Sequence, residues 1–205
     1  MRYVRIPFFV AAMLFATISF AAETEATSAN PELEASAKEW LVKLFEASKK
    51  VNGPEQKAAR AHIENSLDWD EVARTCLGDA EWKKQAGKNR TEFRNLLKEV
   101  IVRTAFTRMD KFWDGATYAW EKATIEGKRV TLRTKFSLKE DSYLLDYYME
   151  KSKSGWHITD LAFEDLRYSV NISEQLNSYL KEKNFGNLLT NLRKKRDGLI
   201  GGKKG

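Results

Sequence analysis

The sequence predicts an α+β domain in which a four-stranded, curved antiparallel sheet packs against several helices. Before Asp114-Gly115, apolar residues recur every three or four positions, as on the buried face of a helix. After that point the period changes to two, which is typical of strands with one buried and one solvated face. Helical spacing then returns near the C-terminus. Helices, a strand meander and further helices indicate helices packed on one face of an antiparallel sheet.

The N-terminus has the pattern of an export signal. Arg2 and Arg5 precede an apolar run over 6–20, and small residues follow at Ser19 and Ala21. We expect a cleavable signal peptide over 1–22 and a flexible leader over 23–30, with an uncleaved N-terminal anchor as the alternative. The chain is therefore expected in the periplasm.

Composition narrows the classes of function. The net charge of +6 includes the two arginines of the signal, so the remainder is too weakly basic to indicate nucleic-acid binding. Cys76 is the single cysteine, which excludes a disulfide framework and favours a bacterial periplasm. No Gly-rich loop follows a strand, so we expect no nucleotide-driven chemistry.

Three helices are predicted in the first part of the chain. The first covers about 31–52, and Pro54 begins the second. Asp68 is the expected N-cap of the third, with Glu71 reaching back as its capping partner. Gly78 is the expected C-terminal stop.

The longest predicted helix covers Thr91–Phe112 and has a wide apolar face. Such a face usually packs on a sheet, and it could also line a cavity. In the strand that follows, over 130–139, the even-numbered residues are apolar except Thr134. The remaining predicted elements are strands at 118–125, 143–150 and 156–163, hairpin turns at 126–128 and 152–155, helices at 165–182 and 186–195, and a disordered Lys/Gly-rich tail at 197–205.

The sequence offers no catalytic or metal-binding constellation. His62 and His157 have no second ligand at metal-binding spacing, and Cys76 has the profile of an inert core thiol. Asp68 and Asp70 are explained by a helix cap. We therefore expect neither an enzyme nor a cofactor or metal.

Asp160 is unusual because it lies within a strand. A buried carboxylate needs partners, and pairing with arginine or backbone N–H groups is favoured over acid–base catalysis.

Large apolar residues gather on the long helix and on one face of the sheet. Periodicity does not distinguish a filled core from a lined pocket, so both interpretations stay open. The large aromatic residues concerned are Phe106, Phe112, Tyr118, Trp120, Phe136, Tyr147, Trp156 and Phe163.

Weak motifs occur in one order along 31–195. They are 67–74 (Leu-Asp-Trp-Asp-Glu-Val-Ala-Arg), Leu77-Gly78, Trp82, 130–134 (Val-Thr-Leu-Arg-Thr), 147–149 (Tyr-Tyr-Met), 155–160 (Gly-Trp-His-Ile-Thr-Asp) and 184–186 (Asn-Phe-Gly). In this order and spacing the chain resembles the periplasmic phospholipid-binding component of the Mla (maintenance of lipid asymmetry, or toluene-tolerance) transport system.

The resemblance implies a lipid cavity between sheet and helices within a domain over 31–196. It implies a soluble, monomeric periplasmic carrier that shuttles phospholipid between an inner-membrane ABC complex and an outer-membrane lipoprotein complex. The bound phospholipid is then cargo and not a cofactor. The expected lining residues are Val72, Leu96, Val100, Ile101, Thr104, Tyr118, Trp120, Leu132, Phe136, Tyr147, Ile158 and Phe163.

Three alternatives remain open. Ile172 and Ser173 stand where that family usually has Tyr and Arg, which suggests a hopanoid or other isoprenoid cargo. Asp160 and the nearby tyrosines would suit a small cone-shaped α+β enzyme. A structural envelope-binding module with a solid core is the third alternative.

Overall fold

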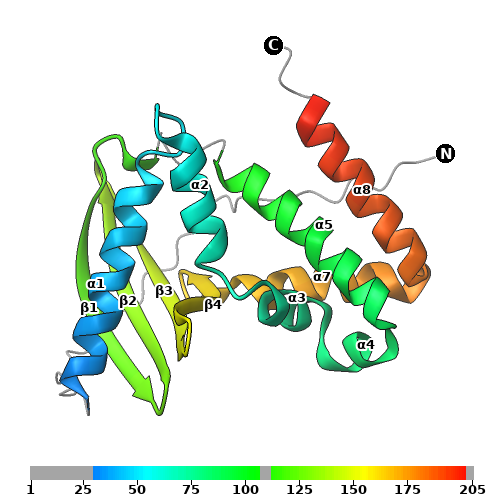
Figure 1. The fold of residues 1–205 in the computed structure, drawn as a ribbon, viewed down its shortest axis with the longest axis horizontal. Coiled ribbons are helices and arrows are strands. Elements are labelled where there is room, and N and C mark those ends of the chain that lie inside the picture. Colours follow the sequence, from blue (N-terminus) through cyan, green and yellow to red (C-terminus); the bar gives the residue numbers. More distant parts are fainter. Residues whose placement is uncertain (1–29, 107–111, 202–205) are drawn as a thin grey trace.

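The computed structural model describes residues 30–106 and 112–201, and the predicted signal peptide lies outside them. The chain forms an antiparallel sheet and two groups of helices, as the α+β prediction requires (Figure 1). The helices are α1 (Pro31–Ser48), α2 (Gln56–Asn65), α3 (Trp69–Leu77), α4 (Asp79–Lys84), α5 (Gly87–Phe106), α7 (Tyr168–Glu182) and α8 (Phe185–Gly201). The strands are β1 (Thr117–Glu126), β2 (Arg129–Leu138), β3 (Asp141–Ser152), β4 (Gly155–Phe163) and β5 (Leu166–Arg167).

The sheet has five strands in the order β1-β2-β3-β4-β5, all antiparallel, so the prediction of four strands was one short. The additional strand forms because Glu164 and Asp165 turn the chain back after β4. Both residues have a positive φ, of 49° and 64°. Glycine usually occupies such positions, so the sequence carried no turn signal there. Consequently α7 begins at Tyr168 and not at the predicted Asp165.

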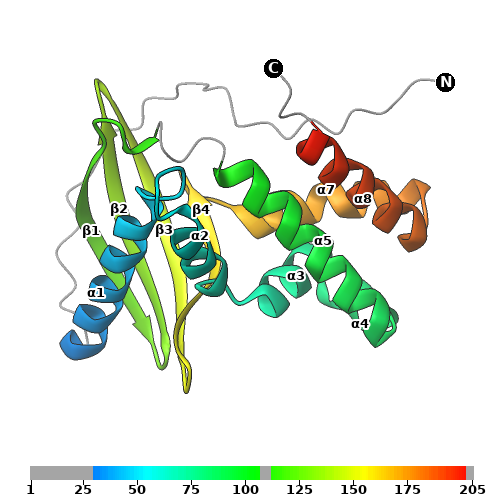
Figure 2. The ribbon, with the colours of Figure 1, turned by 45° about the horizontal axis from the view of Figure 1, so that its top comes forward.

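Two large hydrophobic clusters hold the fold, beside a small third one around Val51 and Ala59. The sheet core joins α1, through residues such as Leu41 and Phe45, to one face of the sheet. We call this the α1 face of the sheet. The helix core joins α3, α5, α7 and α8. In both views α1 and α2 lie beside the sheet, and the other helices lie together on the side of β4, where α3 and α7 contact that strand (Figure 2).

Contrary to the expectation from its wide apolar face, the long helix α5 does not pack on the sheet. Its buried residues Phe93, Leu96 and Leu97 belong to the helix core, where α5 packs against α3 and α8. Helix α1 packs on the sheet instead, and its apolar stripe has the same helical period as that of α5. Helix α5 begins at Gly87, four residues earlier than predicted, and 107–111 of the predicted helix lie outside the described residues.

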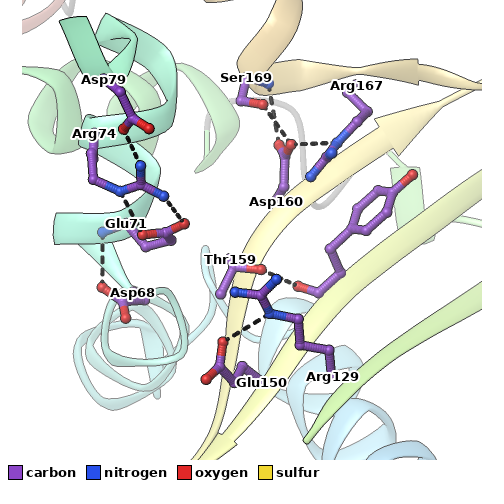
Figure 3. Close-up of polar contacts among 11 residues, drawn as sticks. Asp68, Glu71, Arg74, Asp79, Arg129, Glu150, Thr159, Asp160, Arg167 and Ser169 are labelled. Carbon is purple, nitrogen blue, oxygen red and sulfur yellow. Dashed lines mark hydrogen bonds and ion pairs between the residues drawn. The ribbon is translucent and has the colours of Figure 1, made fainter. Parts of the chain in front are cut away.

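Details at three helix ends differ from the predictions. Asp68 caps α3 by accepting from Glu71 N at 3.0 Å, but the Glu71 carboxylate pairs with Arg74 and does not reach back (Figure 3). Gly78 ends α3 as predicted, and α4 follows it at once. The tail predicted to be disordered from 197 is helical as far as Gly201, and 202–205 lie outside the described residues. Helix α1 ends at Ser48, before the predicted 52.

One short segment ties the two cores together. Ser66 O accepts from Ile158 N at 2.8 Å, and Asp68 N donates to Ile158 O at 2.9 Å. Between them Leu67 packs against both the sheet core and the helix core. The backbone N–H of Asp68 thus donates to β4. Because a capping box needs this N–H as the donor to the Glu71 carboxylate, Glu71 does not complete one.

Candidate functional site

The predicted lining residues fall on both cores. The helix core includes Val72 and Leu96, with Ile101 packed against it. On the same helix Val100 is buried, and the Thr104 hydroxyl donates to Val100 O at 2.8 Å. The sheet core contains or contacts Tyr118, Trp120, Leu132, Phe136, Tyr147 and Ile158. Phe163 is 46% exposed.

Strand register aligns one row of side chains across all five strands on the α1 face. Opposite residues of an antiparallel pair share a face, and the pairs Trp120–Thr134, Thr134–Leu145, Leu145–Phe163 and Phe163–Leu166 connect in series. We call these five residues the apolar row. Its exposure rises from 0% at Thr134 to 46% at Phe163 and 66% at Leu166. The row therefore connects the buried sheet core to the surface.

Aromatic rings cover the inner part of the α1 face. The Phe45 ring of α1 lies 4.9 Å from Tyr118, 5.5 Å from Phe136 and 5.6 Å from Tyr147, between ring centroids. Burial raises the pKa of Tyr147 above its usual value. The inner end of the apolar row is therefore a dry, aromatic environment.

Thr134 is the polar member of this row. Among the described residues, its Oγ1 is the one buried side-chain N or O atom without a hydrogen-bond partner. Thr134, Leu145 and Leu166 were not among the residues predicted to line the site. The signal for Thr134 was present, because it alone breaks the apolar alternation of β2.

The opposite face of the sheet carries buried carboxylates that are paired. Arg133 donates to both carboxylate oxygens of Asp146, each at 2.7 Å. Asp160 accepts from Arg167 Nε at 2.9 Å, from Leu161 N at 2.9 Å, and from both the backbone N–H and the hydroxyl of Ser169 (Figure 3). The prediction that Asp160 pairs with arginine and backbone N–H groups is confirmed. Its lone pairs are occupied, which leaves it poorly placed as an acid–base catalyst.

The other candidate reactive groups, Cys76 and His157, lie in surroundings that fit a structural role. Cys76 is buried in the helix core, and burial raises the pKa of its thiol to about 12, as expected of an inert core thiol. The His157 ring is within hydrogen-bond distance of Ser154 Oγ, at 3.0 Å.

Across the described ranges, no three His, Cys, Asp or Glu side chains are grouped as a metal site requires. Within those ranges, no helix combines the length and apolarity needed to cross a bilayer.

An open pocket of about 970 Å³ lies between α1 and α2, away from the predicted lining residues. Its wall is mostly apolar, and charged groups stand along it, including Lys43, Glu46 and the ion pair of Lys50 with Glu55 at 2.8 Å. Because the pocket is open to solvent and has charged groups along it, it gives acyl chains little shelter from water. The apolar row is the better candidate for an apolar ligand.

Comparisons with known proteins bear on the family and the fold of this chain. A family model described as MlaC protein matches residues 37–194. A solved structure of a phospholipid-binding protein from Ralstonia solanacearum in complex with a phospholipid is similar, with a TM-score of 0.69 at 18% sequence identity. The similarity covers 82% of this chain and 98% of that one. No curated protein sequence matches the chain.

Proposed function

We propose that this chain, which belongs to the MlaC family, is a phospholipid carrier that holds acyl chains along the apolar row of its sheet. The observation that carries the proposal is the gradient of exposure along that row, from Leu166 at the surface to Thr134 in the sheet core. A purely structural core has no need of an apolar path to solvent. The phospholipid held by the Ralstonia protein of similar fold supports the same cargo class.

Hydrophobic transfer explains why such a carrier is needed. Taking acyl chains from a bilayer into water costs about 0.8 kcal/mol per CH₂, which amounts to tens of kcal/mol for a diacyl lipid. Moving the same chains onto a dry apolar surface costs little, because one apolar environment replaces another. Modest biases at either membrane are then enough to load and unload the protein without a catalyst.

The exposed end of the row has the character of a site where lipid first makes contact. In the described part of the chain, the exposed large hydrophobic residues are Phe163, Leu166, Tyr168 and Val170, all within eight consecutive positions. Phe163 also contacts the Tyr143 ring, with centroids 5.6 Å apart. This concentration of apolar surface is unusual for a protein without an apolar partner.

Transport between membranes is the further part of the proposal. The export pattern at 1–22 supports a periplasmic location, and family membership supports docking to an inner-membrane ABC complex and an outer-membrane lipoprotein complex.

Two alternatives lose their support. Ile172, which stands where the family usually has Tyr, does not indicate an isoprenoid cargo, because it is buried in the helix core and not on the apolar row. The small-enzyme alternative loses its candidate catalytic residue, because the Asp160 carboxylate is fully hydrogen-bonded.

Lipid analysis of the exported wild-type protein tests this proposal. Protein purified from a periplasmic extract without detergent should contain phospholipid in near-stoichiometric amount, detected by native mass spectrometry and by extraction. A control protein exported and purified in the same way should contain none. Wild-type protein that is free of lipid, and takes up none from vesicles, would contradict the proposal.

A further inference from the structure

Thr134 occupies a position where a hydroxyl group is unfavourable. It lies at the centre of β2, is 0% exposed, and its Oγ1 has no hydrogen-bond partner. A buried hydroxyl without a partner forfeits the hydrogen bonds that it made to water, so such atoms are rare in folded proteins. Valine would fill the same space in a strand without this loss. The hydroxyl therefore needs an explanation.

The surroundings of Thr134 do not favour a buried water as its partner. Along the row its neighbours are Trp120 and Leu145, and along the strand on the same face they are Leu132 and Phe136. Of these four side chains only Trp120 carries a polar atom. A buried water typically makes two to four hydrogen bonds, which this environment does not supply.

The apolar row leads from Thr134 to the surface and so indicates the direction from which an external partner would approach. Thr134 is three strands from Leu166, about 14 Å at the usual strand spacing. The intervening residues Leu145 and Phe163 become progressively more exposed toward Leu166. A lipid chain that lies along the row would bring its own atoms against the Thr134 hydroxyl.

We propose that Thr134 Oγ1 hydrogen-bonds a carbonyl or hydroxyl oxygen of the cargo lipid and thereby selects lipids that carry such a group on or beside their apolar chains. This inference rests on the proposed function and names a residue that would set its specificity. Two sources have the required chemistry: a hydroxyl group borne on the lipid chain, which reaches Thr134 when the headgroup stays at the exposed end of the row, and the ester carbonyl of a diacyl lipid. Both can pair with a threonine hydroxyl.

Isosteric replacement separates this role from packing. Thr134→Val keeps the shape and removes the hydroxyl, whereas Thr134→Ser keeps the hydroxyl. Because no protein hydrogen bond is lost, Thr134→Val should fold normally and melt about 2–4 °C higher than wild type. This stability readout verifies that any change in lipid binding does not come from misfolding.

The binding test uses three lipids presented in vesicles: diester phosphatidylglycerol, its dialkyl ether analogue, and that ether carrying a hydroxyl on one chain. Wild type and Thr134→Ser should bind the hydroxylated ether about three- to tenfold more tightly than the plain ether, the effect of one net hydrogen bond. Thr134→Val should bind both ethers equally. A preference of wild type for the diester over the plain ether, again lost in Thr134→Val, would assign the partner to the ester carbonyl.

Unchanged preferences in Thr134→Val, or no preference of wild type within any pair, would overturn the role of Thr134 while leaving the carrier proposal intact. Failure of wild-type protein to bind any of the three lipids would instead refute the proposed function itself. The two failures are therefore distinguishable in one experiment.

Discussion

Replacing Asp160 by alanine is expected to lower the free energy of unfolding by about 3 kcal/mol. The carboxylate is 6% exposed and accepts four hydrogen bonds, from Leu161 N, Arg167 Nε, Ser169 N and Ser169 Oγ. Ser169 lies in the first turn of α7, whose own N-cap residue makes no side-chain cap bond. The Asp160 carboxylate thus serves as the cap from β4 and interacts favourably with the helix dipole. Its loss leaves buried donors without partners.

Urea unfolding followed by tryptophan fluorescence measures this effect. The expected value lies at the low end of the range for buried ion pairs, because Arg167 is 44% exposed and can turn toward water. Glu150→Ala is the matched control. It removes the exposed Glu150–Arg129 pair, 3.4 Å long, and should change stability by no more than about 0.5 kcal/mol. A loss for Asp160→Ala as small as that of Glu150→Ala would show that the Asp160 contacts are not structural.

Replacing both Phe163 and Leu166 by serine is expected to slow phospholipid uptake from vesicles by about tenfold or more. A tenfold effect corresponds to 1.4 kcal/mol, or roughly 55 Å² of apolar contact with the incoming chain. These side chains are 46% and 66% exposed, so their removal from the fold costs little. Uptake of a fluorescent phospholipid by the purified protein gives the rate.

Val170→Ser is the control for this double substitution. Val170 is 49% exposed and lies near the same surface, but it belongs to α7 and not to the apolar row. Because Val170 shares the exposed apolar surface but does not belong to the row, its substitution should slow uptake by no more than about twofold, well below the effect of the double substitution. Equal slowing by Val170→Ser would indicate a general effect of surface apolarity, and an unchanged rate in the double variant would exclude Phe163 and Leu166 from the loading step.

Much of the sheet was predictable because its strands have one face buried. In β2 the alternation over 130–139 matches the observed burial, and the predicted hairpin turns join the strands in the correct order. The turn at Glu164-Asp165 escaped prediction because neither residue is glycine. Contacts distant in sequence hold it: Arg133 pairs with Asp165, and Glu164 Oε1 accepts from Leu144 N at 2.8 Å.

The candidate site was only partly predictable for a different reason. Periodicity identifies which face of a helix is buried, but it does not identify the element that buries it. The faces of α5 and of the sheet were therefore assigned to one cavity, although Leu96 lies in the helix core and Phe136 in the sheet core. Whether both faces contact the lipid stays a prediction. The apolar row required strand register, which the sequence does not specify across five strands.

Photo-crosslinking with a phospholipid that carries a photoactivatable group on an acyl chain tests the central claim most directly. Wild-type protein loaded with this lipid should give crosslinked peptides from β3 and β4, at or beside Leu145 and Phe163, and further label on β2 near Thr134. The same lipid with the photoactivatable group on its headgroup should label these strands weakly. Acyl-chain label confined to α2 or to the helix core, with none on β2–β5, would contradict the account.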